Sequence, residues 1–164
     1  MTRHPLALVC VRGYRVAALL DAAQAVLSPH LSWIILHVVD IRPLGEVERA
    51  LGALPGRGPG QHHASTLMLQ AAEELEQVVR QDVLAWLTAT GRTAELVVRR
   101  GDPEREILAV ANERAVDVIV LGSDHSGPGP LPLSPPVRHL IDHARCDVLL
   151  LRRYALETGP AQKA

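Results

Sequence analysis

Short, wholly apolar runs alternate along this chain with segments whose apolar residues recur at helical spacing. A run that is apolar at every position is typical of a parallel strand buried on both faces. The helical segments between such runs would supply the layers that cover the sheet. The alternation therefore predicts an α/β fold built on one parallel sheet with helices on both of its faces.

Five runs read as strands, at residues 6–11, 31–39, 94–99, 117–121 and 147–151. Helix boundaries are marked by Gly91, which is placed to end a long helix, and by Asp102 and Ser134, each of which is followed by proline. Five parallel strands favour a doubly wound, flavodoxin-like sheet in the order 3-2-1-4-5. That order places the loops after Val11 and Leu121 across a crevice, where such folds bind ligands.

The chain of 164 residues suits a single domain, which we place at residues 1–154, with a loose tail at 155–164. Residues 41–63 hold five glycines and three prolines. This composition predicts a flexible insertion with one helical turn near Glu46–Leu51. The regular long helix is expected to begin only at Ala64.

Bulk composition excludes several classes of function. The net charge of −1 gives no global attraction to nucleic acid or to an anionic membrane. No apolar run approaches the length of about 20 residues that a membrane-spanning helix needs. Cys10 and Cys146 have no CxxC spacing, which favours two free thiols in a reducing cytoplasm.

The sequence contains neither the GxSxG motif of covalent catalysis nor the Walker A motif of phosphate binding. His139 and His143 have the spacing that could share a metal ion, but without a third ligand they are read as surface histidines. His37 is read as a packed, hydrogen-bonded core residue in preference to a catalytic one. The sequence therefore does not argue for an enzyme or for a resident metal.

Four segments in order carry a resemblance to a known family: LHVVD at 36–40, GDPEREIL at 101–108, DVIVLGS at 117–123 and HARCDVLLLR at 143–152. The chain resembles the universal stress protein family (the UspA domain) over nearly its whole length. The resemblance implies an adenine-nucleotide-hydrolase-like fold and a role in the stress response. It also implies ATP or AMP as the candidate ligand and a homodimer formed through the last strand, Asp147 to Leu151.

ATP-binding members of that family carry a Gly-x2-Gly-x9-Gly-(Ser/Thr) motif. Counted from Gly122, the second glycine is replaced by His125 and the third by Pro135, whereas Ser134 takes the third position if the loop is one residue short. Gly127 remains, but off the spacing. The first strand of such members ends in Asp-Gly-Ser, and here the residues are Arg12, Gly13 and Tyr14.

These departures affect phosphate binding. Proline has no N–H, so Pro135 and Pro136 remove two donors from the first turn of the last helix, where a phosphate would bind. Arg12 could compensate as a cation in the crevice, or it could form a salt bridge with Asp40 or Asp124. The predicted cofactor-binding residues are Arg12, Gly13, Val39, Asp40, Gly122, Ser123, His125, Gly127 and Ser134.

Three functions stay open on this reading. The first is a non-catalytic stress-response protein with weakened or lost ATP binding. The second is a sensor of ATP or AMP with a remodelled phosphate loop. The third is a weak ATPase or a redox protein.

Overall fold

The computed structural model describes residues 3–52, 60–123 and 133–152. Its strands are β1 (Leu6–Val11), β2 (Ser32–Asp40), β3 (Glu95–Gly101), β4 (Val118–Gly122) and β5 (Asp147–Leu151). They form one parallel sheet in the order β3-β2-β1-β4-β5. The predicted doubly wound sheet and its strand order are therefore confirmed.

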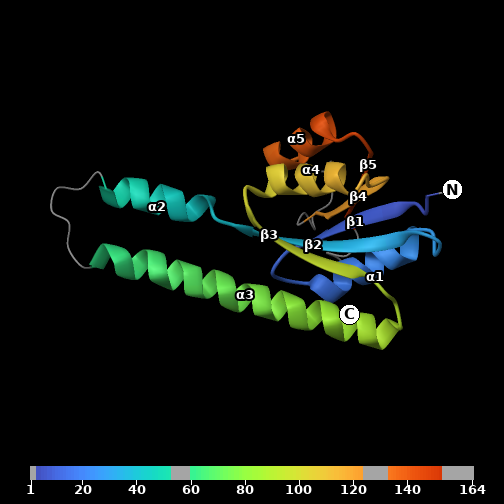
Figure 1. Ribbon diagram of the computed structural model, residues 1–164, viewed down its shortest axis with the longest axis horizontal. Coiled ribbons are helices and arrows are strands. Elements are labelled where there is room, and N and C mark those ends of the chain that lie inside the picture. The colour runs from blue at the N-terminus through green and yellow to red at the C-terminus, as the bar shows by residue number, and fades with distance from the viewer. Residues whose placement is uncertain (1–2, 53–59, 124–132, 153–164) are drawn as a thin grey trace, which may run out of the picture.

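Helices cover both faces of this sheet (Figure 1). Helices α1 (Val16–Val26) and α3 (Gly60–Thr90) pack on one face. Helices α4 (Pro103–Glu113) and α5 (Pro135–His143) pack on the other. Because the side chains of each strand alternate between the two faces, the central strands β1 and β2 contribute to both hydrophobic clusters.

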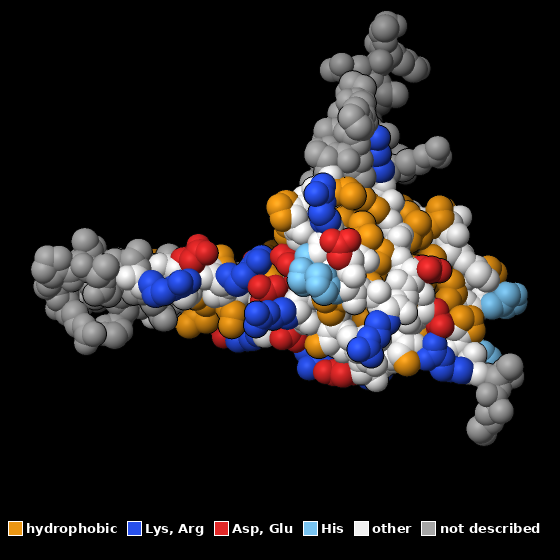
Figure 2. Space-filling view, turned by 90° about the horizontal axis from the view of Figure 1, so that it is seen from above, with side chains coloured by type: hydrophobic (Ala, Val, Ile, Leu, Met, Phe, Trp, Pro, Cys, Tyr) orange, Lys and Arg blue, Asp and Glu red, His pale blue; other side chains and the backbone are white. Residues whose placement is uncertain are grey.

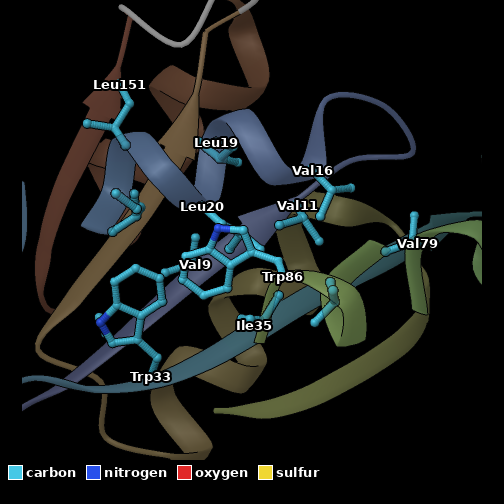
Figure 3. Packing of buried hydrophobic residues seen from close by; sticks show 14 residues of the cluster. Val9, Val11, Val16, Leu19, Leu20, Trp33, Ile35, Val79, Trp86 and Leu151 are labelled. Atoms are coloured by element: carbon cyan, nitrogen blue, oxygen red, sulfur yellow. The ribbon is translucent and has the colours of Figure 1, made fainter. Parts of the chain in front are cut away.

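The cluster beneath α1 and α3 is aliphatic apart from two indole rings (Figure 3). Trp33 on β2 stacks on Trp86 on α3, with ring centroids 5.8 Å apart. The indole N–H of Trp86 donates to a carboxylate oxygen of Asp21 at 2.7 Å, which ties α3 to α1. Stacked aromatic pairs add to the stability that their buried area provides. With no Phe in the sequence, this pair supplies the aromatic part of the cluster.

Local signals in the sequence fix the ends of two helices as predicted. Gly91 follows α3 with a φ of +66°, a left-handed conformation that favours glycine. Asp102 caps α4: its carboxylate accepts from the backbone N–H groups of Glu104 and Arg105. Pro103 occupies the first turn of α4, where a missing N–H costs no helical hydrogen bond.

The prediction for residues 41–63 was wrong about helix content. Helix α2 spans Arg42–Gly52, and α3 begins at Gly60 rather than at Ala64. In Figure 1, α2 lies beside the first part of α3, and the two project beyond the sheet as a two-helix arm. Pro43 is compatible with this helix because it lies in the first turn. Packing against α3 thus outweighs the low helix propensity of the glycines.

A substitution at Leu20 on α1 would test how much the aliphatic cluster contributes to the free energy of unfolding. The Leu20 side chain is fully buried among residues of β1, α1 and α3. We expect Leu20→Ala to lower the free energy of unfolding by about 2–5 kcal/mol, because it removes buried methyl groups and leaves a cavity. Val26→Ala on the same helix is the control, since the Val26 side chain is 60% exposed. Urea denaturation measures both, and equal losses would contradict this account.

Candidate functional site

A cavity of about 480 Å³ opens at the carboxyl ends of the central strands. It lies where β1 pairs with β2 on one side and with β4 on the other, which is the topological switch point of the sheet. Its volume lies within the range of small-ligand pockets. Residues of α3, α4 and α5 complete its walls.

Five of the predicted site residues line this cavity: Arg12, Gly13, Val39, Asp40 and Gly122. Ser123 is buried beside it, and its backbone N–H donates to the carbonyl oxygen of Leu151 at 2.9 Å. Ser134 occupies the N-cap position of α5. His125 and Gly127 lie outside the described residues.

Gly13 lies against α3 at the edge of the cavity. A Cβ atom at this position would collide with the side chain of Leu75, which also lines the cavity. The segment that follows β1 therefore meets the Leu75 side chain of α3 at a position without a side chain of its own. Leu75 belongs to α3, so this helix supplies part of the cavity wall beside Gly13.

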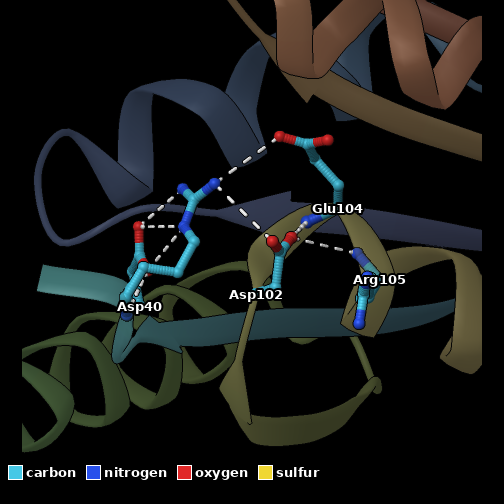
Figure 4. Close-up of polar contacts among 5 residues, drawn as sticks. Asp40, Asp102, Glu104 and Arg105 are labelled. Carbon is cyan, nitrogen blue, oxygen red and sulfur yellow. Dashed lines mark hydrogen bonds and ion pairs between the residues drawn. The ribbon is translucent and has the colours of Figure 1, made fainter. Parts of the chain in front are cut away.

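Arg42, the first residue of α2, forms the main polar network of the cavity and was missed by sequence reasoning. Its guanidinium donates to both carboxylate oxygens of Asp40, with N–O distances of 2.7–3.2 Å. Another of its nitrogens lies 3.7 Å from Asp102 and 3.7 Å from Glu104, at the start of α4 (Figure 4). These hydrogen bonds hold the pKa of the Asp40 carboxyl below its ordinary value, so Asp40 is ionised near neutral pH.

Arg42 lies within residues 41–63, the segment predicted to be a flexible insertion, and so it was not considered as a site residue. Sequence reasoning considered Arg12 as the salt-bridge partner of Asp40, whereas the structure places Arg42 on both oxygens of that carboxylate. An Asp-x-Arg spacing at the end of a strand could have indicated the pair, since the two side chains lie two residues apart.

Two helix N-termini border the cavity. Pro103 and Glu104 of α4 line it, and so do Pro136 and Val137 of α5. A helix N-terminus ordinarily offers free N–H groups to an anion. The N–H groups of Glu104 and Arg105 are already taken by Asp102, at 3.0 and 3.4 Å. The first two positions of α5 are prolines and have no N–H to offer.

Two residues with reactive side chains also line the cavity. His37 is 3% exposed, and its Nδ1 donates to the carbonyl oxygen of Val11 at 3.2 Å, which confirms the predicted packed role. A carbonyl oxygen only accepts, so Nδ1 carries the proton in the neutral ring. Burial lowers the pKa of His37 and keeps the ring neutral. Burial also raises the pKa of Cys10 to about 12, so its thiol is not ionised near neutral pH.

The described residues lack two further features. Within residues 3–52, 60–123 and 133–152, no group of three or more His, Cys, Asp or Glu side chains is arranged to hold a metal ion. No helix in these same ranges is both long and apolar enough to cross a membrane.

Comparisons with known proteins point to one family. The model of the universal stress protein family matches residues 14–152. The universal stress protein UspA from Lactobacillus plantarum is 22% identical, with a TM-score of 0.59 over 93% of this chain and 100% of that one. A universal stress protein family protein from Arabidopsis thaliana, solved with AMP bound, is 17% identical, with a TM-score of 0.61 over 96% of this chain and 97% of that one. Among curated proteins, the comparison found no match.

Burial of His37 predicts a pH dependence of stability. Its pKa in the folded state lies below the ordinary value of 6.5, so the unfolded chain binds more protons just below that pH. The stability contributed by neutral His37 is therefore present above about pH 6.5 and is lost as the pH falls toward the folded-state pKa. We expect His37→Asn, which keeps a donor for Val11, to flatten the fall in unfolding free energy between about pH 6.5 and 5.

Urea titrations at a series of pH values measure this effect. His30→Asn is the control, because His30 is exposed. If the His37 variant loses as much stability on acidification as the parent protein, burial of this ring is not the cause.

Proposed function

This chain belongs to the universal stress protein family, and from that premise we propose that it is a non-catalytic stress-response protein whose cavity binds an adenine ligand with little help from the phosphate groups. The single observation that carries the proposal is the start of α5. It borders the cavity at the switch point of the sheet, and its first two positions, Pro135 and Pro136, provide no N–H for an anion.

An adenine ligand is supported by the place and size of the cavity. The related protein from Arabidopsis thaliana was solved with AMP bound and has the same fold. In this chain the cavity lies at the switch point, where α/β sheets bind ligands, and its volume of about 480 Å³ suits a small molecule. A sensor of ATP or AMP with normal phosphate contacts is the second candidate, and the prolines of α5 weigh against it.

A non-catalytic role is supported by the chemistry of the side chains in the cavity. The thiol of Cys10 has a raised pKa, so it is a poor nucleophile. The protonated ring nitrogen of His37 is engaged by Val11, and the ring is buried. Neither group has the arrangement of an activated nucleophile with its base. We also propose that the protein acts in the cytoplasm, where free thiols such as those of Cys10 and Cys146 stay reduced.

A homodimer through β5 is also part of the proposal. β5 is an edge strand of the sheet, and its leucines are only partly covered by the helices, apart from Leu151. An exposed edge strand can pair with the same strand of a second copy about a two-fold axis. The neighbouring face of α4 and α5 carries charges of both signs, intermixed, which does not oppose the approach of an identical chain (Figure 2).

Restoring the missing donors tests the role of α5. We expect the wild-type protein to bind ATP with Mg²⁺ weakly, with a Kd well above the micromolar range, in isothermal titration calorimetry. Pro135→Ala with Pro136→Ala should tighten ATP binding by about tenfold or more, since a hydrogen bond to a charged group contributes about 1.5–3 kcal/mol. Pro29→Ala is the control, because Pro29 precedes the amino end of β2, whereas the cavity lies at the carboxyl ends of the strands. An unchanged Kd in the double variant would show that α5 does not limit phosphate binding.

The β5 interface predicts the effect of a charge on that strand. Leu150→Lys should convert a dimer into a monomer in sedimentation velocity, because it places an ammonium group on the half-buried apolar face of the edge strand, where a second copy would pack. Leu84→Lys on α3 is the matched control, as the Leu84 side chain is 59% exposed and lies away from β5. Circular dichroism reports whether each variant is folded. A folded Leu150→Lys protein that still sediments as a dimer would exclude this interface.

A further inference from the structure

We infer that the cavity selects an uncharged nucleoside over its phosphorylated forms, because carboxylates already engage Arg42 and the first turn of α4, and the first two positions of α5 have no N–H. The inference rests on the proposed function and specifies its ligand class. It depends on three groups that could bind a phosphate: the guanidinium of Arg42, the N-terminus of α4 and the N-terminus of α5.

Both sides of the Arg42 guanidinium already face carboxylates. One side donates to both oxygens of Asp40, at 2.7–3.2 Å. The other side faces Asp102 and Glu104, each at 3.7 Å. Bidentate recognition is how arginine binds both carboxylates and phosphates, so a phosphate would have to displace a carboxylate that is already bound in that way.

The two helix N-termini beside the cavity are closed to anions in different ways. At α4, the carboxylate of Asp102 occupies the N–H groups of Glu104 and Arg105 (Figure 4). At α5, Pro135 and Pro136 remove the N–H groups of the first two positions. The field of the α4 N-terminus is thus neutralised by a carboxylate, and the α5 N-terminus lacks its first two N–H donors.

The charges around the cavity act in the same direction. The single guanidinium of Arg42 pairs with three carboxylates, those of Asp40, Asp102 and Glu104. Among these described side chains the negative charges outnumber the positive ones. A triphosphate would add several negative charges beside them, and like charges brought together at a binding site oppose association.

A nucleoside has polar groups that can bind to the carboxylates of Asp40, Asp102 and Glu104, which we call the rim of the cavity. Its ribose hydroxyls and exocyclic amine are hydrogen-bond donors, and an ionised carboxylate is an acceptor with lone pairs to spare after it binds one arginine. The apolar part of the wall, which includes Val11, Val39 and Ile107, suits the faces of a base. The pattern of acceptors around an apolar cavity therefore fits adenosine better than ATP.

The test compares adenosine, AMP and ATP with Mg²⁺ by isothermal titration calorimetry against the full-length protein. We expect adenosine to bind at least about tenfold more tightly than ATP, with AMP between them. Raising the salt concentration should tighten ATP binding, because salt screens a repulsion, and should leave adenosine binding unchanged. A site that attracts phosphate would show the opposite response to salt.

A charge-removing variant isolates the rim. Asp102→Asn with Glu104→Gln keeps the side-chain shapes, and asparagine retains the ability to cap α4. It should tighten ATP binding at least about fivefold and change adenosine binding by less than about twofold. Glu95→Gln with Glu113→Gln is the matched control: it removes two carboxylates that pair with Arg114 and Arg99, none of which lines the cavity. Equal effects of the two double variants would contradict a local role of the rim.

The outcomes separate this inference from the proposed function. If ATP binds as tightly as adenosine or more tightly, the selection for a nucleoside is overturned, while the adenine site of the proposed function stands. If no adenine ligand gives a signal up to millimolar concentration, the proposed function fails, and the inference fails with it. Adenosine binding that exceeds ATP binding and responds to Asp102→Asn with Glu104→Gln in the stated direction supports both.

Discussion

The pairing of β1 with β2 on one side and with β4 on the other determines where this protein can bind a ligand. The connection from β1 leads to β2 and the connection from β4 leads to β5, on opposite sides of the centre of the sheet. The cavity lies at the carboxyl ends of the strands where these directions diverge. Its position follows from the order of the strands, while its chemistry depends on the residues that follow each strand.

The centre of the sheet could be predicted because every position of its strands carries the same signal. Residues such as Leu8, Val9 and Ile35 are fully buried, and a strand covered on both faces must be apolar throughout. Capping signals are equally local: Asp102 needs only its own carboxylate and the next turn of backbone. Such features depend on a few neighbouring residues, so they can be read without knowledge of the fold.

The two-helix arm and the contacts of Arg42 with α4 could not be predicted in this way. Helix α2 contains Gly45 and ends at Gly52, and its neighbour in space is α3, which begins at Gly60. A helix of this length is marginal in water, so its stability comes from packing that the local sequence does not display. Arg42 was missed for the same reason, because its ion pairs join the start of α2 to α4, which is far away in the chain.

The Asp40–Arg42 pair shows why an interaction can matter for binding more than for stability. Both side chains are more than one-third exposed, at 34% and 43%, and exposed ion pairs contribute only about 0–1 kcal/mol to folding. The pair nevertheless fixes one guanidinium and one carboxylate at the edge of the cavity. Because the two groups bind each other, the guanidinium is less available to an anionic ligand and the carboxylate is less available to a cationic one. Because Arg42 is also the first residue of α2, the start of the arm and the electrostatics of the cavity depend on the same side chain. Under the proposed function, the class of ligand is therefore set by the residues at the end of β2 and at the starts of α2, α4 and α5, and not by the sheet.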